Sequence, residues 1–239
     1  MNYLNEINYK YLCEGLTYDF QDWIVLDDLL TEYNKKNHNI DRIVEANKLE
    51  GFFHKLSIAG PELIFSMNIF HHPSKGKLST ADVGANSENN DVQPQLHLTL
   101  HSPSLDVPQR IEIPLKYVLK GLPPLKGKHM VYLHAICLNN GSKYVYYGRT
   151  KRGWMKRFNE HVKLAMKGSH RKFPLLFGNA IFARYNQLLN ITENQTDLLY
   201  IGSHHVVCAA GLEKDTAINV EHYLINKYSL GAEDGLNMI

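Results

Sequence analysis

Residues 130–149, MVYLHAICLNNGSKYVYYGR, decide the fold of the C-terminal half of this chain. Two runs rich in β-branched and aromatic residues, Met130–Leu138 and Lys143–Arg149, flank the sequence Asn-Asn-Gly-Ser. Strand-forming runs joined by four residues of strong turn chemistry are typical of a β-hairpin. The sequence therefore predicts a hairpin with Tyr132 on its first strand and with Tyr146 and Gly148 on its second.

An amphipathic helix is expected directly after this hairpin, over Trp154–Lys167, with Gly168 as its stop signal. Its apolar stripe consists of Met155, Phe158, Val162 and Ala165. Its polar side is almost entirely basic, and Arg157 and His161 are four residues apart, so both belong to one helix face. A further strand is expected around Leu198–Val207.

The last predicted helix, Asp215–Leu230, contains a carboxylate where its pattern calls for a hydrophobic residue. Glu221 lies among Ile218, Leu224 and Ile225, which recur at helical spacing. Desolvating an unpaired carboxylate costs several kcal/mol, so glutamate is rarely buried without a partner. A metal ion, a basic side chain or a cleft that faces a substrate would offset this cost. A structural ion pair is an equal alternative.

The N-terminal part predicts a second α+β domain. Two short helices are expected between Tyr3 and Asn37. Alternating apolar residues predict strands at Leu56–His71, Gln95–Ser102 and Arg110–Val118, which would form a three-stranded antiparallel sheet. The polar stretch Pro73–Gln95 is expected to be a long mobile loop. The segment GLPPLKGK at 121–128 marks the boundary, which gives domains of residues 1–125 and 126–239.

The positive charge of the chain is concentrated in one segment. The whole chain has a net charge of +2, but Lys126–Arg184 holds 13 basic residues and one acid, Glu160, a net charge of +12. The remaining residues carry −10. Such asymmetry favours a polyanionic partner, and nucleic acid is the first expectation. A solvated basic face is the alternative.

Other compositional features favour a cytoplasmic protein. Cys13, Cys137 and Cys208 form no CxxC pair, and an odd number of scattered cysteines suits a reducing compartment. The first twenty residues lack the apolar block of a signal peptide. No stretch has the ~20 consecutive apolar residues that a membrane span requires, so no membrane partner is expected.

The order of these motifs resembles the GIY-YIG nuclease family, over about residues 128–239. The matching stretches are Met130-Val131-Tyr132, Tyr146-Tyr147-Gly148, the Arg157–His161 pair, the helix around Glu221 and the GLN sequence that ends at Asn237. The first motif lacks its glycine, and Tyr147 occupies the isoleucine position of the second. The resemblance implies a small three-stranded antiparallel or mixed sheet flanked by helices. It also implies a metal-dependent DNA endonuclease. The resemblance does not extend to residues 1–125.

The resemblance also implies a role for each site residue. Tyr132 would be the base or would position water, and Glu221 would hold one Mg²⁺ (or Mn²⁺). Arg157 would clamp the phosphate, since a guanidinium grips phosphate bidentately. Tyr146 and His161 would orient water or relay protons, and Asn237 would be a supporting or phosphate-contacting residue. Nearby cations would lower the pKa of Tyr132 from its free value near 10.

Alternatives remain open for each residue and for the whole chain. The tyrosines can be ordinary sheet residues, Arg157 and His161 ordinary residues of a basic helix, and Asn237 a turn residue. The leading hypothesis is a restriction-type enzyme that cuts double-stranded DNA, with residues 1–125 selecting the target and a homodimer supplying two active sites. A repair or mobile-element nuclease, a catalytically degenerate nucleic-acid-binding module and a protein-interaction domain are the other hypotheses. The basic residues expected to contact DNA are Lys143, Arg149, Lys151, Arg152, Lys156, Lys163, Arg171 and Lys172.

Overall fold

The computed structural model describes residues 1–13, 20–50, 61–72, 74–90, 93–101, 108–138, 141, 143–168, 171 and 200–237. The chain divides into two compact units. The first comprises Met1–Lys128 with Ala210–Leu212, and the second comprises His129–Ala209 with Glu213–Ile239. Both contain helices and strands, so the predicted α+β class is confirmed.

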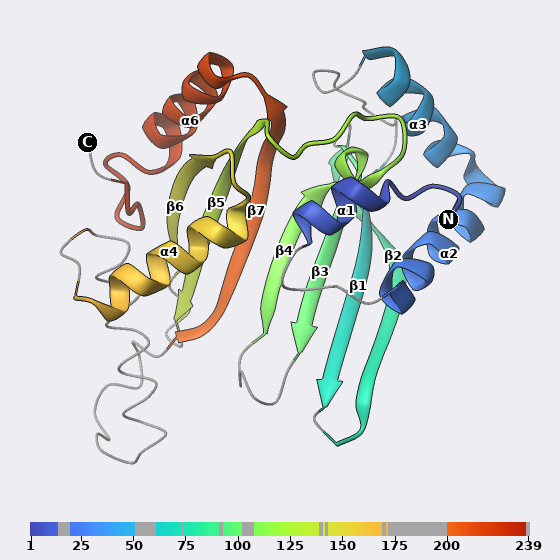
Figure 1. Cartoon of the computed structure of the whole chain (residues 1–239), viewed down its shortest axis with the longest axis horizontal. Coiled ribbons are helices and arrows are strands. Elements are labelled where there is room, and N and C mark those ends of the chain that lie inside the picture. The colour runs from blue at the N-terminus through green and yellow to red at the C-terminus, as the bar shows by residue number, and fades with distance from the viewer. Residues whose placement is uncertain are drawn as a thin grey trace. The chain divides into compact units, whose positions relative to one another are not determined.

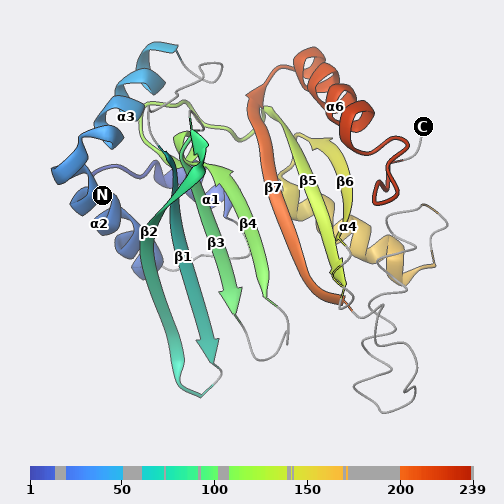
Figure 2. The same cartoon turned by 180° about the vertical axis from the view of Figure 1, so that it is seen from behind.

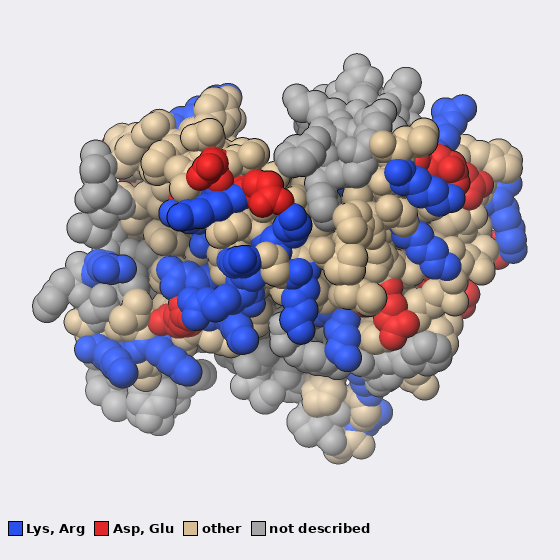
Figure 3. Space-filling view, turned by 45° about the horizontal axis from the view of Figure 1, so that its top comes forward, with Lys and Arg blue, Asp and Glu red and all other residues tan. Residues whose placement is uncertain are grey.

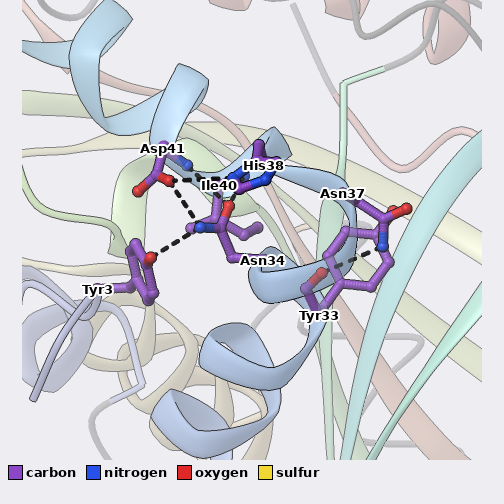
Figure 4. A network of polar contacts seen from close by, with 7 residues as sticks. All are labelled: Tyr3, Tyr33, Asn34, Asn37, His38, Ile40 and Asp41. Atoms are coloured by element: carbon purple, nitrogen blue, oxygen red, sulfur yellow. Dashed lines mark hydrogen bonds and ion pairs between the residues drawn. The ribbon is translucent and has the colours of Figure 1, made fainter.

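Three helices belong to the first unit: α1 (Glu6–Leu12), α2 (Phe20–Asn37) and α3 (Asn39–Glu50). The third was not predicted. A network around Asn34 joins α2 to α3 (Figure 4). The Asn34 side-chain oxygen accepts hydrogen bonds from the backbone N–H groups of Ile40 and Asp41, which caps α3. Its amide nitrogen donates to the Tyr3 hydroxyl and to the Asp41 carboxylate. This network therefore fixes the turn between the two helices.

The strands of the first unit are β1 (Pro61–His72), β2 (Gly76–Asn90), β3 (Gln95–His101) and β4 (Gln109–Pro114). Their order is β2-β1-β3-β4, with β1 parallel to β3 and the other pairs antiparallel. A 3₁₀ turn, η2 (Leu115–Val118), follows β4. Helices α1 and α2 lie behind the strands in Figure 2. The buried alternate residues form the core of this unit, and they are Phe65, Met67, Ile69, Leu96, Leu98, Ile111 and Ile113.

Three predictions for the first unit were wrong. The strand expected over Arg110–Val118 ends at Pro114, and η2 follows directly. Residues 76–90 form the strand β2 and not a mobile loop. The expected three-stranded antiparallel sheet therefore has four described strands, and it is mixed because β1 and β3 are parallel. Pairing in a sheet uses backbone groups, so a polar strand at a sheet edge needs few apolar side chains. Residues 51–60, where the strand was expected to start, lie outside the described residues.

The second unit contains β5 (His129–Leu138), β6 (Lys143–Thr150), α4 (Trp154–Met166), residues 200–209 of β7 (Tyr200–Leu212) and α6 (Lys214–Tyr228). The strand order is β7-β5-β6, and the predicted hairpin of β5 and β6 is confirmed. Helix α4 lies across the strands of this unit in Figure 1. It buries Phe158 and Ala165 against Ile136 and Leu138 of β5.

Among the described residues, the longest helices are too short or too polar to cross a membrane.

Candidate active site

Tyr132 and Gly148 lie opposite each other in the β5–β6 hairpin. The phenol ring of Tyr132 packs directly over Gly148, because a Cβ at position 148 would lie 2.5 Å from the Tyr132 hydroxyl oxygen. Tyr132 is 1% exposed, and its hydroxyl has no hydrogen bond of good geometry among the described residues. The second motif thus needs glycine because its partner strand places an aromatic ring there.

Tyr146 and His161 are brought together as predicted. Tyr146 pairs across the hairpin with His134, and its ring lies 4.9 Å from that of His161, centroid to centroid. The two rings meet edge to face at 72°. His161 is buried, and burial together with the positive charge of Arg157 lowers the pKa of the His161 imidazole to about 4. The imidazole is therefore neutral at neutral pH.

Arg157 lies beside both phenols, on the same side of the hairpin. Burial raises the pKa of Tyr132 above 10, and the guanidinium of Arg157 opposes this rise. Burial also raises the pKa of Tyr146, again against the effect of Arg157. The expectation that neighbouring cations would lower the pKa of Tyr132 was therefore wrong in its net direction, because desolvation outweighs them.

Glu160 holds the guanidinium of Arg157. Its carboxylate accepts from Nη1 of Arg157, three residues earlier on α4. The same carboxylate receives Nη2 of Arg152, at 2.7 Å. Burial would raise the pKa of Glu160, but the two arginines outweigh it and lower that pKa. The one acid of the basic segment is therefore shared between two arginines.

Glu221 reaches the edge of this cluster from α6. Its carboxylate accepts a 2.6 Å hydrogen bond from Nε of Arg149 on β6, and its side chain is 16% exposed. The negative charge of Glu221 contributes to the raised pKa values of Tyr132 and Tyr146. Glu221 is thus within electrostatic range of both phenols, and Arg149 offsets the cost of its burial.

The structure gives Asn237 a positioning role and not a place beside the phenols. Its side-chain oxygen accepts from the Tyr147 backbone N–H at 2.9 Å, and its amide donates to the Tyr147 carbonyl at 2.7 Å. Gly235 pairs with Val145 in an adjacent bridge. Through these two bonds Asn237 attaches the segment that follows α6 to β6.

A buried pair of histidines next to the phenols was missed in the sequence. The Nδ1 atoms of His134 and His205 lie 2.9 Å apart, and both side chains are buried. The His134 ring also packs against Tyr132, with centroids 4.4 Å apart. Burial lowers the pKa of His134 well below its usual value and that of His205 to about 3. One ring must donate and the other accept, so the pair is neutral.

Lys and Arg side chains gather on the left of the face shown in Figure 3. The predicted DNA-contacting residues that the structure describes all belong to the second unit. Lys151, Lys156, Lys163 and Arg171 are exposed. Lys143 is also exposed and contacts His204, whereas Arg149 and Arg152 pair with Glu221 and Glu160. Lys172 lies outside the described residues.

Glu221 is the carboxylate that the sequence assigned to a divalent cation, and Arg149 already binds it. No group of three or more His, Cys, Asp or Glu side chains within the described ranges is arranged to hold a metal. Mg²⁺ commonly uses one or two protein carboxylates and keeps several waters. Arg149 occupies one Glu221 oxygen, Oε2, and the other carboxylate oxygen, Oε1, is the one suited to such an ion.

Comparison with known proteins gives no relative: no protein-family model, no curated protein and no solved structure matches this chain.

Proposed function

We propose that the second unit is a GIY-YIG-like nuclease domain that hydrolyses phosphodiester bonds in DNA with a divalent cation. One arrangement carries this proposal: Arg157 lies beside the phenols of Tyr132 and Tyr146, with His161 behind Tyr146 and Glu221 within electrostatic range of both. Tyr132, Tyr146, Arg157 and His161 come from three consecutive elements, β5, β6 and α4, whereas Glu221 comes from α6, more than 50 residues later in the sequence. Side chains that act on the same phosphate group must lie on one face of the fold.

Arg157 is the residue that binds the scissile phosphate in this proposal. A guanidinium presents parallel N–H donors to phosphate oxygens and compensates the charge that grows on them during hydrolysis. Arg157 is fixed for this purpose on a helix rather than on a loop, and its side chain is 29% exposed. A phosphate can therefore reach it from solvent.

The two phenols act in their neutral forms. Because burial raises both pKa values, Tyr132 and Tyr146 keep their protons at neutral pH. Tyr132 would donate a hydrogen bond to a phosphate oxygen after DNA binding exposes its hydroxyl, which is buried in the free chain. Tyr146 would orient water, and the neutral imidazole of His161 beside it can accept a proton.

Glu221 would hold Mg²⁺ or Mn²⁺, which when bound supplies Lewis acidity and charge compensation at the phosphate. The Glu221 carboxylate would bind the cation and Arg149 at the same time, or it would release Arg149 when the cation binds. Substitution of Glu221 therefore tests the proposal, because a carboxylate that only pairs with Arg149 would have a structural role and no catalytic one.

The first unit would select the DNA target, which makes the chain a sequence-specific, restriction-type enzyme for double-stranded DNA. A homodimer would supply one active site for each strand. The exposed lysines of the second unit support a DNA partner, because phosphate contacts supply most non-specific affinity. The cytoplasm is the proposed location.

A catalytically degenerate DNA-binding module is the second candidate function. Two observations favour it: the Glu221–Arg149 ion pair and the raised pKa of Tyr132. An ion-paired carboxylate and a protonated phenol can both serve the stability of the fold alone. Both candidates predict salt-dependent DNA binding, so turnover distinguishes them.

Incubation of the full chain with mixed plasmid and phage DNA and Mg²⁺ tests the proposal. Discrete fragments that disappear with EDTA support a restriction-type nuclease, and a smear indicates cleavage without sequence preference, as a repair or mobile-element enzyme can show. DNA that is bound but left intact supports the degenerate module.

A further inference from the structure

Glu160 is the single acid among the 59 residues from Lys126 to Arg184, a segment with a net charge of +12. An acid there weakens the attraction of the surface for DNA. The contacts of Glu160 suggest a role that compensates for this weaker attraction. The carboxylate does not point away from the basic surface; it bridges Arg152 and Arg157.

The bridge restricts the guanidinium of Arg157. A free arginine side chain samples many rotamers, and about 2 kcal/mol of rotamer entropy is lost when it is fixed. Glu160 binds the Nη1 end of this guanidinium from its position three residues further along α4, a spacing that places the two side chains on the same helix face. The positive charge of this guanidinium also acts on the phenols of Tyr132 and Tyr146, where it opposes the rise of their pKa values.

Arg152 in turn holds Glu160. Its Nη2 lies 2.7 Å from Oε1 of Glu160, whereas Arg157 uses Oε2, so each carboxylate oxygen has its own arginine. The Arg152 backbone N–H is itself bound to the Thr150 hydroxyl at 3.0 Å, at the end of β6. The chain of contacts thus runs from the hairpin through Arg152 and Glu160 to Arg157.

We propose that Glu160 is a positioning residue that aims the guanidinium of Arg157 at the phosphate, and that Arg152 is its support. This inference rests on the proposed nuclease function. Glu160 would then have two opposite effects. Its negative charge weakens DNA binding, and its contact with Arg157 accelerates cleavage.

The test compares Glu160→Gln and Glu160→Asp with the wild-type chain in single-turnover cleavage at saturating DNA, with DNA affinity measured in Ca²⁺. Glu160→Gln is expected to bind DNA more tightly and to cleave it about 10- to 100-fold more slowly, the loss typical of a misplaced catalytic group. Glu160→Asp keeps the charge but shortens the reach, so it should slow cleavage without tighter binding. Cleavage by Glu160→Gln at or above the wild-type rate would overturn the inference.

A second measurement separates this inference from the nuclease proposal. If the wild-type chain binds DNA without cutting it, the nuclease proposal fails, and the Nη1–H signal of Arg157 in a ¹H–¹⁵N spectrum tests the geometry, because Glu160 binds Nη1. The inference expects a slowly exchanging signal in the wild type that is lost in Glu160→Gln. An unchanged signal in that variant would show that Glu160 does not fix Arg157.

Discussion

The ring of Tyr132 lies on Gly148, so closely that a single added methyl group at position 148 would come within 2.7 Å of the ring carbon Cζ. Gly148→Ala should therefore push Tyr132 out of its place. We expect a loss of about 1 to 3 kcal/mol in unfolding free energy, as for other overpacked cores, together with loss of cleavage. Urea denaturation and a plasmid assay measure both effects.

Gly84 provides the matched control. It also lies in a strand, but a Cβ there would meet no atom within 4 Å. Gly84→Ala should leave both stability and cleavage close to wild type. If Gly148→Ala behaves in the same way, the close packing of Tyr132 over the hairpin is not important for the site.

Tyr132→Phe separates the hydroxyl from the ring. The hydroxyl is buried without a well-formed hydrogen bond among the described residues, so its removal should change the unfolding free energy by less than about 1 kcal/mol. Cleavage should fall by about 100-fold, as expected when a positioned proton donor is removed. Thermal unfolding and single-turnover rates provide the readouts. A stable variant with undiminished cleavage would assign Tyr132 to the core alone.

Asn237→Ala should reduce stability more than it affects DNA affinity. The change leaves the buried backbone N–H and C=O of Tyr147 without partners, which costs about 2 to 5 kcal/mol in total. Asn226, an exposed residue of α6, is the matched control, and Asn226→Ala should have little effect. A stable Asn237→Ala variant that has lost cleavage would instead indicate that the side chain acts on the substrate.

Stability should fall as the pH falls below about 6.5, the usual pKa of a histidine in an unfolded chain. His161 and His205 have folded pKa values of about 4 and about 3, and that of His134 is also depressed. The unfolded chain therefore binds more protons in this window, and each histidine removes about 1.4 kcal/mol per pH unit. The stability that these neutral histidines contribute is fully present at pH values above the histidine pKa of the unfolded chain.

Urea denaturation between pH 7 and pH 5 measures this slope. Replacing His205 by glutamine should reduce the slope by about one proton, whatever its effect on stability at pH 7. His222, which is exposed on α6, is the control, and His222→Gln should leave the slope unchanged. An equal slope in the wild type and in His205→Gln would contradict the buried neutral histidine pair.

The sequence predicted the second unit better than the first because its periodic patterns are local. The β5–β6 hairpin and the apolar stripe of α4 are encoded in neighbouring residues, and both elements are confirmed. Strand β2 lacks such a pattern, since its polar residues obtain their strand structure by pairing with β1. Local propensity gives no signal for a contact of that kind.

Side-chain partnerships were the least predictable part of the site. The unusual position of Glu221 was visible as a break in the helical pattern, but its partner Arg149 was not, because the two residues meet through the fold. His134 and His205 look like ordinary strand residues in the sequence and become a pair when β7 lies beside β5. The net effect on the pKa of Tyr132 depends on burial, which the hairpin pattern does not give.

The rate at which Glu221→Gln cleaves duplex DNA in Mg²⁺ tests the central claim most directly, with Glu233→Gln, an exposed change of the same charge, as the control. The nuclease account predicts that the wild type and Glu233→Gln cut DNA, that EDTA stops them, and that Glu221→Gln binds DNA without cutting it. Cleavage by Glu221→Gln at the wild-type rate would contradict the account and leave the carboxylate as the structural partner of Arg149.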